Sequence, residues 1–332
     1  MTYIDWQLRR IAKSRHPVIV GPFRTELGFE ATYMLPWFTK WRLDYKVDAE
    51  RLIAFTRGGA GTWYQTGRTV ELYDYLPLQD VRVAMIQDHA ERESVKHVTV
   101  SELETHLIRM LAARLGLKKY HVLHPSLMYT QLEPWWANKW SLAHLIDKLA
   151  FVVPPVPLLP IDTILPERYI CVRFYQRPTW PMYEETTGWV NALVANLAQH
   201  IPVVVIGSTA YTDTHVDFPI EPHPNVTNLV DAFPIRENLG MQSAVIAKAA
   251  AFLGTYGGLM QLAVRLGIPS AGFYLDWHHT AYAHKILTEW LGVQAKIPVF
   301  VGRPQEADFL RQVYPVQLDL PKWRGGSSSG GK

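Results

Sequence analysis

Glycines, arginines and carboxylates in this chain gather where buried strands would end. The clearest group is a Gly-rich turn over 254–258, which follows an apolar run over 251–254 and leads into a helical pattern. Such a turn aims backbone N–H groups and the positive end of a helix dipole at one point, which suits a phosphate group. Arg173 and Arg177 follow another apolar run, and a planar guanidinium fits diphosphate oxygens. A structural salt bridge to Glu184, Glu185 or another acid is the alternative role for this pair.

Two carboxylates in the first half could act on a hydroxyl group. Glu26 and Glu30 stand one helical turn apart, and Glu26 opens the helical pattern. A carboxylate in a cleft can act as a general base or a nucleophile, so we take Glu26 as the leading candidate, with Glu30 or Arg24 assisting. The alternative is a residue that stabilises the helix dipole as a cap.

The remaining candidate site residues follow the expected strands, because ligands in open parallel sheets bind beyond the carboxyl ends of the strands. The candidates for a phosphorylated ligand are Gly207, Ser208, Gly254, Thr255, Tyr256, Gly257, Gly258 and Gln261. The candidates for the first half of the cleft are Arg57, Gly58, Gly59, Tyr64 and His124. His278 and His279 beside Asp276 have no metal-ligand spacing, so we expect neither a metal nor a resident cofactor.

Composition narrows the function classes. The chain has 332 residues, 48% of them hydrophobic and 19% charged, as in globular proteins, and this length predicts two domains. The net charge of +3 without Lys/Arg blocks argues against nucleic acid as a partner. The single cysteine excludes an internal disulfide and fits a reducing compartment, and no apolar run is long enough to span a membrane. We therefore expect a cytoplasmic protein.

The elements that must position these residues alternate between strand and helix. First-half strands are expected at 16–21, 51–56, 81–87 and 120–123, and helices at 26–41, 101–115 and 136–149, with a kink or break at Pro36. Ser101 as N-cap and Glu104 three residues later predict a capping box at the start of the helix over 101–115. Second-half strands are expected at 168–174, 202–207, 225–229, 251–254 and 270–274, and helices at 185–200, 235–250 and 256–266. Apolar strands alternating with amphipathic helices predict α/β domains built on parallel sheets.

A Pro-rich stretch divides the chain. Residues 151–160 contain four prolines and read as an extended connector between two Rossmann-like domains that face a cleft. We expect the first domain over 1–150 to bind an acceptor and the second over 161–324 to bind a donor. The tail over 325–332, GGSSSGGK, reads as a linker or tag remnant.

Several of these segments resemble GT-B glycosyltransferases. The sequence FLGTYGGLMQLA over 252–263, with LGIP over 266–269, is similar to the donor-binding segment of heptosyltransferases and, more distantly, of fucosyltransferases. ICVRF over 170–174 followed by Arg177 resembles the fucosyltransferase strand whose arginine grips the donor diphosphate. GPFRTELGFE over 21–30 with Pro36-Trp37 is similar to the opening motif of bacterial polysaccharide glycosyltransferases.

The resemblance implies a metal-independent transfer of a sugar from an activated donor to a glycan hydroxyl in bacterial surface polysaccharide or lipopolysaccharide biosynthesis. The expected partners are the activated sugar donor and the glycan acceptor, with membrane association through a lipid-linked acceptor left open. The alternatives are a transferase that uses CMP-Kdo or phosphoribosyl pyrophosphate, a nucleotide-sugar epimerase, and a non-catalytic sugar- or nucleotide-binding protein.

Overall fold

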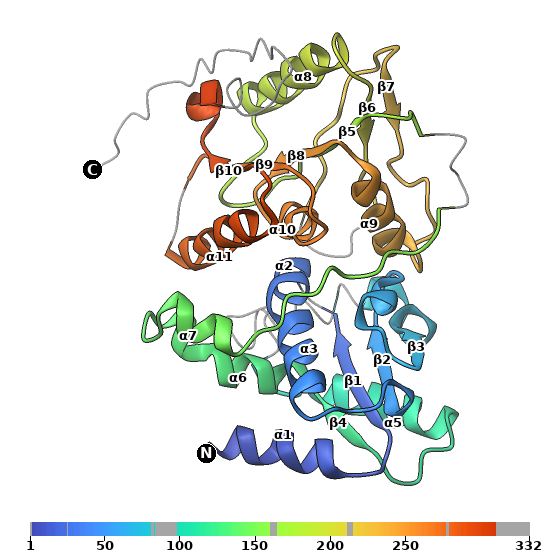
Figure 1. Ribbon diagram of the computed structural model, residues 1–332. Helices are drawn as coiled ribbons and strands as arrows, with labels where there is room; N and C mark the ends of the chain where they lie inside the picture. The colour runs from blue at the N-terminus through green and yellow to red at the C-terminus, as the bar shows by residue number, and fades with distance from the viewer. Residues whose placement is uncertain are drawn as a thin grey trace.

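The computed structural model describes residues 2–24, 26–80, 83, 98–159, 165–210, 215–276 and 279–309. These residues form two sheets with helices around them, one sheet in each half of the molecule (Figure 1). The first sheet has the strand order β3-β2-β1-β4, and the second has the order β10-β9-β8-β5-β6-β7. Every strand pair in both sheets is parallel. The predicted α/β architecture with two Rossmann-like sheets is confirmed.

The first half is built on short, apolar strands. Its strands are β1 (Val18–Phe23), β2 (Leu52–Thr56), β3 (Arg68–Glu71) and β4 (His121–Leu123). Its helices include α1 (Tyr3–Lys13), α5 (Glu102–Arg114), α6 (Pro125–Trp136) and α7 (Leu142–Asp147). Every residue of β1 and β2 is buried, because helices cover both faces of a parallel sheet. Short 3-10 turns span Ala49–Arg51, Ala60–Tyr64 and Leu72–Asp74.

The helix expected over 26–41 is continuous but irregular. It consists of α2 (Leu27–Phe29), the π-helical turn η1 (Glu30–Met34) and α3 (Leu35–Asp44). Pro36 falls in the first turn of α3, where its missing N–H leaves the register free to widen. The chain therefore absorbs the proline by a π turn and not by a break, and Glu30 lies in that turn.

The second half follows the predicted order closely. Its strands are β5 (Ile170–Arg173), β6 (Val203–Val205), β7 (Val226–Asn228), β8 (Ala251–Thr255), β9 (Ser270–Phe273) and β10 (Val299–Gly302). Its helices are α8 (Glu184–Ala198), α9 (Asn238–Lys248), α10 (Gly258–Arg265) and α11 (His279–Ala295), with a 3-10 turn at Pro304–Phe309.

Some expectations were wrong or lie outside the described residues. The single helix expected over 136–149 is replaced by α6, which ends at Trp136, and by the short α7. The reason is local: Pro125 opens α6 and Asn138 turns the chain with a φ of 56°. The elements α1, β3, α11 and β10 were not predicted. Most of the strand expected over 81–87, and all of the tail over 325–332, lie outside the described residues.

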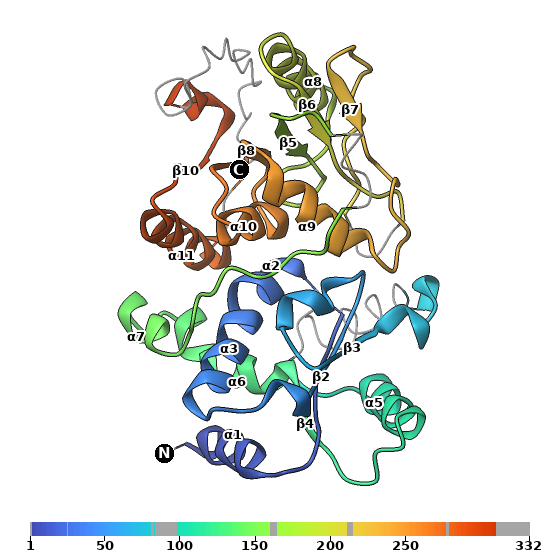
Figure 2. The ribbon, with the colours of Figure 1, turned by 45° about the vertical axis from the view of Figure 1, so that its right-hand side comes forward.

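The two halves pack against each other (Figure 1, Figure 2). Residues 151–159 form no helix or strand and run between the halves. The side chain of Arg265, at the end of α10, donates a hydrogen bond of 2.7 Å to the Val152 carbonyl of this connector. α10 also packs against α2 and η1 of the first half. None of the described helices is long and apolar enough to cross a membrane.

Candidate functional site

The second sheet has the strand order of a dinucleotide-binding fold. When the strands are numbered in chain order from β5, the sheet order β7-β6-β5-β8-β9-β10 becomes 3-2-1-4-5-6. β6 and β7 are added on one side of β5, and β8, β9 and β10 are added on its other side, so the strand order reverses between β5 and β8. In such sheets the ligand crevice opens beyond the carboxyl ends of these two strands. Arg173 ends β5 and Thr255 ends β8, so the predicted arginines and the Gly-rich turn meet at this place.

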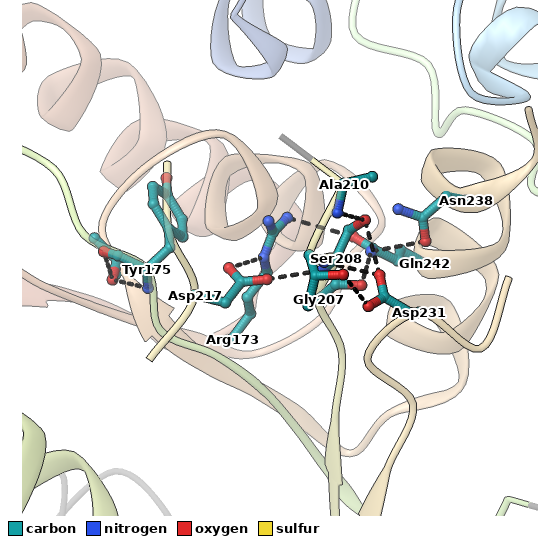
Figure 3. A network of polar contacts seen from close by, with 11 residues as sticks. Arg173, Tyr175, Gly207, Ser208, Ala210, Asp217, Asp231, Asn238 and Gln242 are labelled. Atoms are coloured by element: carbon teal, nitrogen blue, oxygen red, sulfur yellow. Dashed lines mark hydrogen bonds and ion pairs between the residues drawn. The ribbon is translucent and has the colours of Figure 1, made fainter. Parts of the chain in front are cut away.

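Arg173 lies in a network of polar groups (Figure 3). Its Nε donates to Asp217 Oδ1 at 2.9 Å, and its Nη1 lies 3.5 Å from Gln242 Oε1. The guanidinium also lies over the Tyr175 ring, 5.4 Å from the ring centroid. The structure therefore shows the salt-bridge alternative for Arg173, with Asp217 as the acid, and the phosphate role of this side chain stays a prediction. The side chain remains 18% exposed.

The loop after β6 is held by two aspartates. The Ser208 N–H donates to Asp217 Oδ2 at 2.8 Å, and Ser208 Oγ donates to Asp231 Oδ1 at 3.1 Å. A Cβ on Gly207 would lie 2.4 Å from Asp217 Oδ2, so only glycine fits there. The Gly207 carbonyl accepts from Gln242 Nε2 at 3.0 Å. The predicted Gly207 and Ser208 therefore belong to the same network as Arg173.

Sequence reasoning missed Asp217, Asp231 and Gln242. Asp217 and Asp231 follow β6 and β7 in loops, and Gln242 lies on the buried side of α9. Asp231 has a φ of 57°, the left-handed conformation that aspartate tolerates better than most residues. A search for acidic residues in loops beyond strand ends would have found both aspartates. Nothing in the local sequence marks Gln242.

Arg177 and Gly257 form a close pair beside Arg173. Arg177 Nη1 donates to the Tyr256 carbonyl at 2.9 Å, while its Nε is buried without a hydrogen-bond partner among the described residues. A Cβ on Gly257 would lie 1.9 Å from the Tyr175 hydroxyl and 3.0 Å from Arg177 Nη1. Glycine at 257 therefore lets a phenol and a guanidinium close over the turn before α10.

The first residues of the Gly-rich turn have structural roles. A Cβ on Gly254 would lie 2.0 Å from the Arg173 carbonyl, so this glycine permits close approach of β8 to β5. Thr255 Oγ1 accepts from the Tyr175 N–H and donates to the Tyr175 carbonyl, both at 2.9 Å. Tyr256 is buried, and burial raises the pKa of its phenol. These contacts hold the Tyr175 and Arg177 loop against the end of β8.

The start of α10 faces the first half of the protein. A Cβ on Gly258 would lie 2.7 Å from the Gly28 N and 2.8 Å from the Leu27 Cβ. Gln261 is 5% exposed, and Thr32 Oγ1 donates to its Oε1 at 3.5 Å. The positive end of α10 therefore lies directly against α2.

Glu26 immediately precedes that contact. It is the N-cap residue of α2, but its side chain makes no capping hydrogen bond. It is half-buried, and within the described part of the chain no hydrogen bond or ion pair engages its carboxylate. Glu26 therefore lies beside the contact between α2 and the start of α10, and the structure does not use it as a side-chain cap.

Glu30 has a different environment although it lies only four residues further on. Its side chain is fully buried, and Oε1 accepts from Thr56 Oγ1 and from the Tyr64 hydroxyl, both at 2.8 Å. Its Oε2 accepts from Arg57 Nη1 at 2.8 Å. The negative charge of Glu30, together with burial, raises the pKa of Tyr64. Glu30, Arg57 and Tyr64 therefore form a closed buried unit behind the cleft.

The turn over Gly58 and Gly59 binds a carboxylate of the protein itself. Their N–H groups donate to the two oxygens of Glu71, each at 3.0 Å. Both glycines have positive φ, 63° and 79°, which a residue with a side chain rarely adopts. The Gly58 carbonyl accepts from the Gly240 N–H at 2.8 Å. This turn therefore joins the two halves.

Arg24 and His124 meet at the carboxyl end of the first sheet. Arg24 Nε donates to Glu104 Oε1 at 3.1 Å, and all three side chains are buried. His124 Nδ1 accepts from the Ser126 N–H at 3.1 Å, which places the imidazole proton on Nε2, 3.4 Å from Glu104 Oε2. Glu104 also accepts from the Ser101 N–H in the predicted capping box. Arg24 therefore belongs to a buried ionic cluster and does not contact Glu26 through any described hydrogen bond.

The described residues contain no group of three or more His, Cys, Asp and Glu side chains that could hold a metal ion. His278 lies outside the described residues.

No protein-family model matches the chain, and no curated protein matches it. A glycosyl transferase family 9 structure from Veillonella parvula is 12% identical, covers 89% of this chain and 88% of its own, and has a TM-score of 0.46. E. coli ADP-heptose lps heptosyltransferase II is 13% identical with coverage of 78% and 84% and a TM-score of 0.43. E. coli heptosyltransferase WaaC with ADP is also 13% identical, with coverage of 87% and 93% and a TM-score of 0.43. The chain is similar to these structures, and its activity has to be argued from its own residues.

Proposed function

We propose that this protein is a glycosyltransferase of the GT-B type. It transfers a sugar from a donor activated by a nucleotide or pyrophosphate group to a hydroxyl of a glycan in bacterial surface polysaccharide biosynthesis. The observation that supports the proposal is the meeting of Arg173, Arg177 and the start of α10 at the switch point of the second sheet. Glu26 opens α2, which packs against α10 from the first half. Sugar transfer needs groups that stabilise the charge of the leaving phosphate and a base that takes the proton of the acceptor hydroxyl. The proposal assigns the first to the second half of the protein and the second to Glu26.

The donor half matches the charge of a diphosphate. The buried Nε of Arg177 has no described partner, although a buried donor without a partner costs about 1–3 kcal/mol. A phosphate oxygen would satisfy it. The N–H groups of the first turn of α10 have no partners within the helix, and the helix dipole adds to their attraction for an anion. Two guanidiniums and this helix end would stabilise the leaving phosphate without a divalent metal.

Glu26 supplies the proton acceptor. In the proposed reaction the acceptor oxygen forms a bond to the anomeric carbon, the bond from that carbon to the phosphate oxygen breaks, and the acceptor proton moves to the Glu26 carboxylate. The leaving phosphate carries away the electron pair of the broken bond. Position favours Glu26 over Glu30, since three hydrogen bonds already engage the buried Glu30 carboxylate.

Donor binding tests one side of the proposal. Arg177→Gln should weaken binding of the best nucleotide among UDP, GDP, ADP and CMP by about 10- to 100-fold, because charge-assisted hydrogen bonds contribute about 1.5–3 kcal/mol. The matched control is Arg168→Gln, which removes the same charge from an exposed side chain just before the opposite end of β5. If none of these nucleotides or phosphoribosyl pyrophosphate raises the melting temperature of the unmodified protein, the donor site is refuted.

Sugar transfer tests the other side. Glu26→Gln should lower kcat by about 10²- to 10⁴-fold, the usual contribution of a general base, while nucleotide affinity stays unchanged. Glu102→Gln on exposed α5 removes an equivalent charge and should leave kcat unchanged. Transfer that survives Glu26→Gln at the original rate would remove Glu26 from the mechanism.

A further inference from the structure

A groove runs along the free edge of the first sheet, away from the donor half. Within the described residues β4 pairs only with β1, so its outer edge is open. A cavity of about 490 Å³ lies there, lined by residues of α1, α5, β4 and α6. A second cavity of about 640 Å³ continues it over α1, and the two share Arg10 and His121. In Figure 2, α1 and α5 lie at the end of the molecule away from the second half. We call the two cavities together the β4 groove.

Among the described residues that line the β4 groove there are four fixed cations and no carboxylate. Its fixed positive charges are Arg9, Arg10, Lys13 and Arg109. All four side chains are exposed, and no described carboxylate forms an ion pair with any of them. Uncompensated charges of one sign in a concave site raise the local concentration of ions of opposite sign. The lining therefore favours an anionic ligand.

The lowered pKa of His121 is consistent with the same excess of positive charge. This histidine lies in both cavities, and its pKa is lowered by burial and by the nearby cations Arg10, His16 and Arg51. Of these, Arg51 donates to the Ala12, Ile11 and His16 carbonyls at the end of α1. The Arg10 guanidinium lines both cavities together with His121 and adds a fixed positive charge beside it.

Aromatic rings extend the groove. Trp6 is 43% exposed and Tyr3 is 69% exposed, and their rings stack with centroids 5.9 Å apart. The Arg10 guanidinium lies over the Trp6 ring at 5.3 Å. Flat exposed rings beside cations suit a ligand that combines an anionic group with the C–H face of a sugar or polyol. The hydroxyl of Ser126 and the Gln7 amide add hydrogen-bonding groups to the lining.

We propose that the β4 groove binds a phosphate group carried on a sugar or polyol. The chemistry is shared by a phosphorylated saccharide and by the headgroup of an anionic phospholipid. The proposal rests on the proposed function, because a glycosyltransferase needs to hold its acceptor on the domain that carries Glu26. At one end of the groove His124 also contacts Glu104, the partner of Arg24 at the carboxyl end of β1.

The experiment compares two phosphate probes on the full chain. Glucose 6-phosphate is titrated by NMR with histidine labelling, and vesicles of phosphatidylglycerol in phosphatidylcholine are tested by cosedimentation. The double variant Arg10→Gln/Arg109→Gln should weaken binding of the occupying probe about tenfold, and that probe should raise the pKa of His121. Arg68→Gln, on the exposed opposite edge strand β3, is the matched control and should bind as the unmodified protein does.

Each outcome decides the proposal. Binding of glucose 6-phosphate that the double variant weakens supports the groove with a soluble phosphorylated saccharide as the ligand. Binding of phosphatidylglycerol vesicles alone, weakened in the same way, supports it with a lipid headgroup. Binding of neither probe, or equal binding by the double variant and Arg68→Gln, overturns it. Nucleotide binding is measured on the same samples, so a failed donor site is seen separately from a failed groove.

Discussion

Replacing Gly257 by alanine should disable the donor site while the fold survives. The new Cβ would lie 1.9 Å from the Tyr175 hydroxyl, whereas ordinary contacts begin near 3.4 Å, so the hydroxyl must move by about 1.5 Å. The same Cβ lies 3.0 Å from Arg177 Nη1, which now donates to the Tyr256 carbonyl at 2.9 Å. Gly257 has a φ of 171°, so alanine introduces no backbone strain. The substitution therefore acts through the position of two side chains.

The expected magnitude follows from these contacts. Displacing the Tyr175 hydroxyl and the Arg177 guanidinium should lower the free energy of unfolding by about 1–2 kcal/mol, as overpacking does. Because the displaced guanidinium is a charge-assisted donor to the nucleotide, nucleotide affinity should fall about 10- to 100-fold. Isothermal titration with the best nucleotide measures the affinity, and urea unfolding measures the stability. Gly188→Ala is the control, since Gly188 is exposed on α8 and a Cβ there meets nothing within 4 Å. It should raise stability by about 0.5–1 kcal/mol and leave affinity unchanged. Unchanged nucleotide affinity in Gly257→Ala would refute the placement of the donor at this turn.

Three further predictions concern buried groups. Glu30→Gln should lower the free energy of unfolding by about 3–5 kcal/mol in urea melts, because it leaves the buried Arg57 cation without its ion-pair partner. Burial raises the pKa of Glu71 above its ordinary value of 4.5, so the folded state binds more protons than the unfolded state. The free energy of unfolding should therefore fall as pH rises from about 4.5, which urea melts at stepped pH would measure. Glu71→Gln should remove this pH dependence. Burial also raises the pKa of the single cysteine, Cys171. A thiol reagent at pH 8 should therefore modify it only at the rate of unfolding. Rapid labelling of the folded protein would contradict its buried placement.

Much of the fold could be predicted because its signals are local. The capping box of Ser101 and Glu104 was read from the sequence and starts α5 as expected. The apolar strands of the second half were placed within a few residues, since fully buried parallel strands are continuous apolar runs. The unpredicted α1 has the opposite character: it is short, rich in charge and exposed on one side, and its buried Leu8 and Ile11 are too few to stand out.

The candidate site was predictable only in part. Arg173, Arg177 and the Gly-rich turn were identified because each follows a strand, and residues beyond parallel strands meet at one edge of the sheet. Their partners could not be identified in this way. Asp217 lies 44 residues from Arg173 and Gln242 lies 69 residues away, and no local pattern links such positions. The same holds for Thr32 and Gln261, which meet across the two halves.

The amino-acid sequence by itself determined the class of fold, the succession of most strands along the chain and the Gly-rich turn between β8 and α10. These follow from hydrophobic periodicity, glycine content and helix signals that act between near neighbours in the chain. Tertiary structure decided how two similar carboxylates differ. Glu30 is buried in a hydrogen-bonded ion pair with Arg57, while Glu26, only four residues earlier, lies at the cleft with its carboxylate unengaged by any described residue. The physical reason is that burial and charge pairing depend on segments distant in the sequence: only the folded chain brings β2 to Glu30 in η1 and α10 to α2.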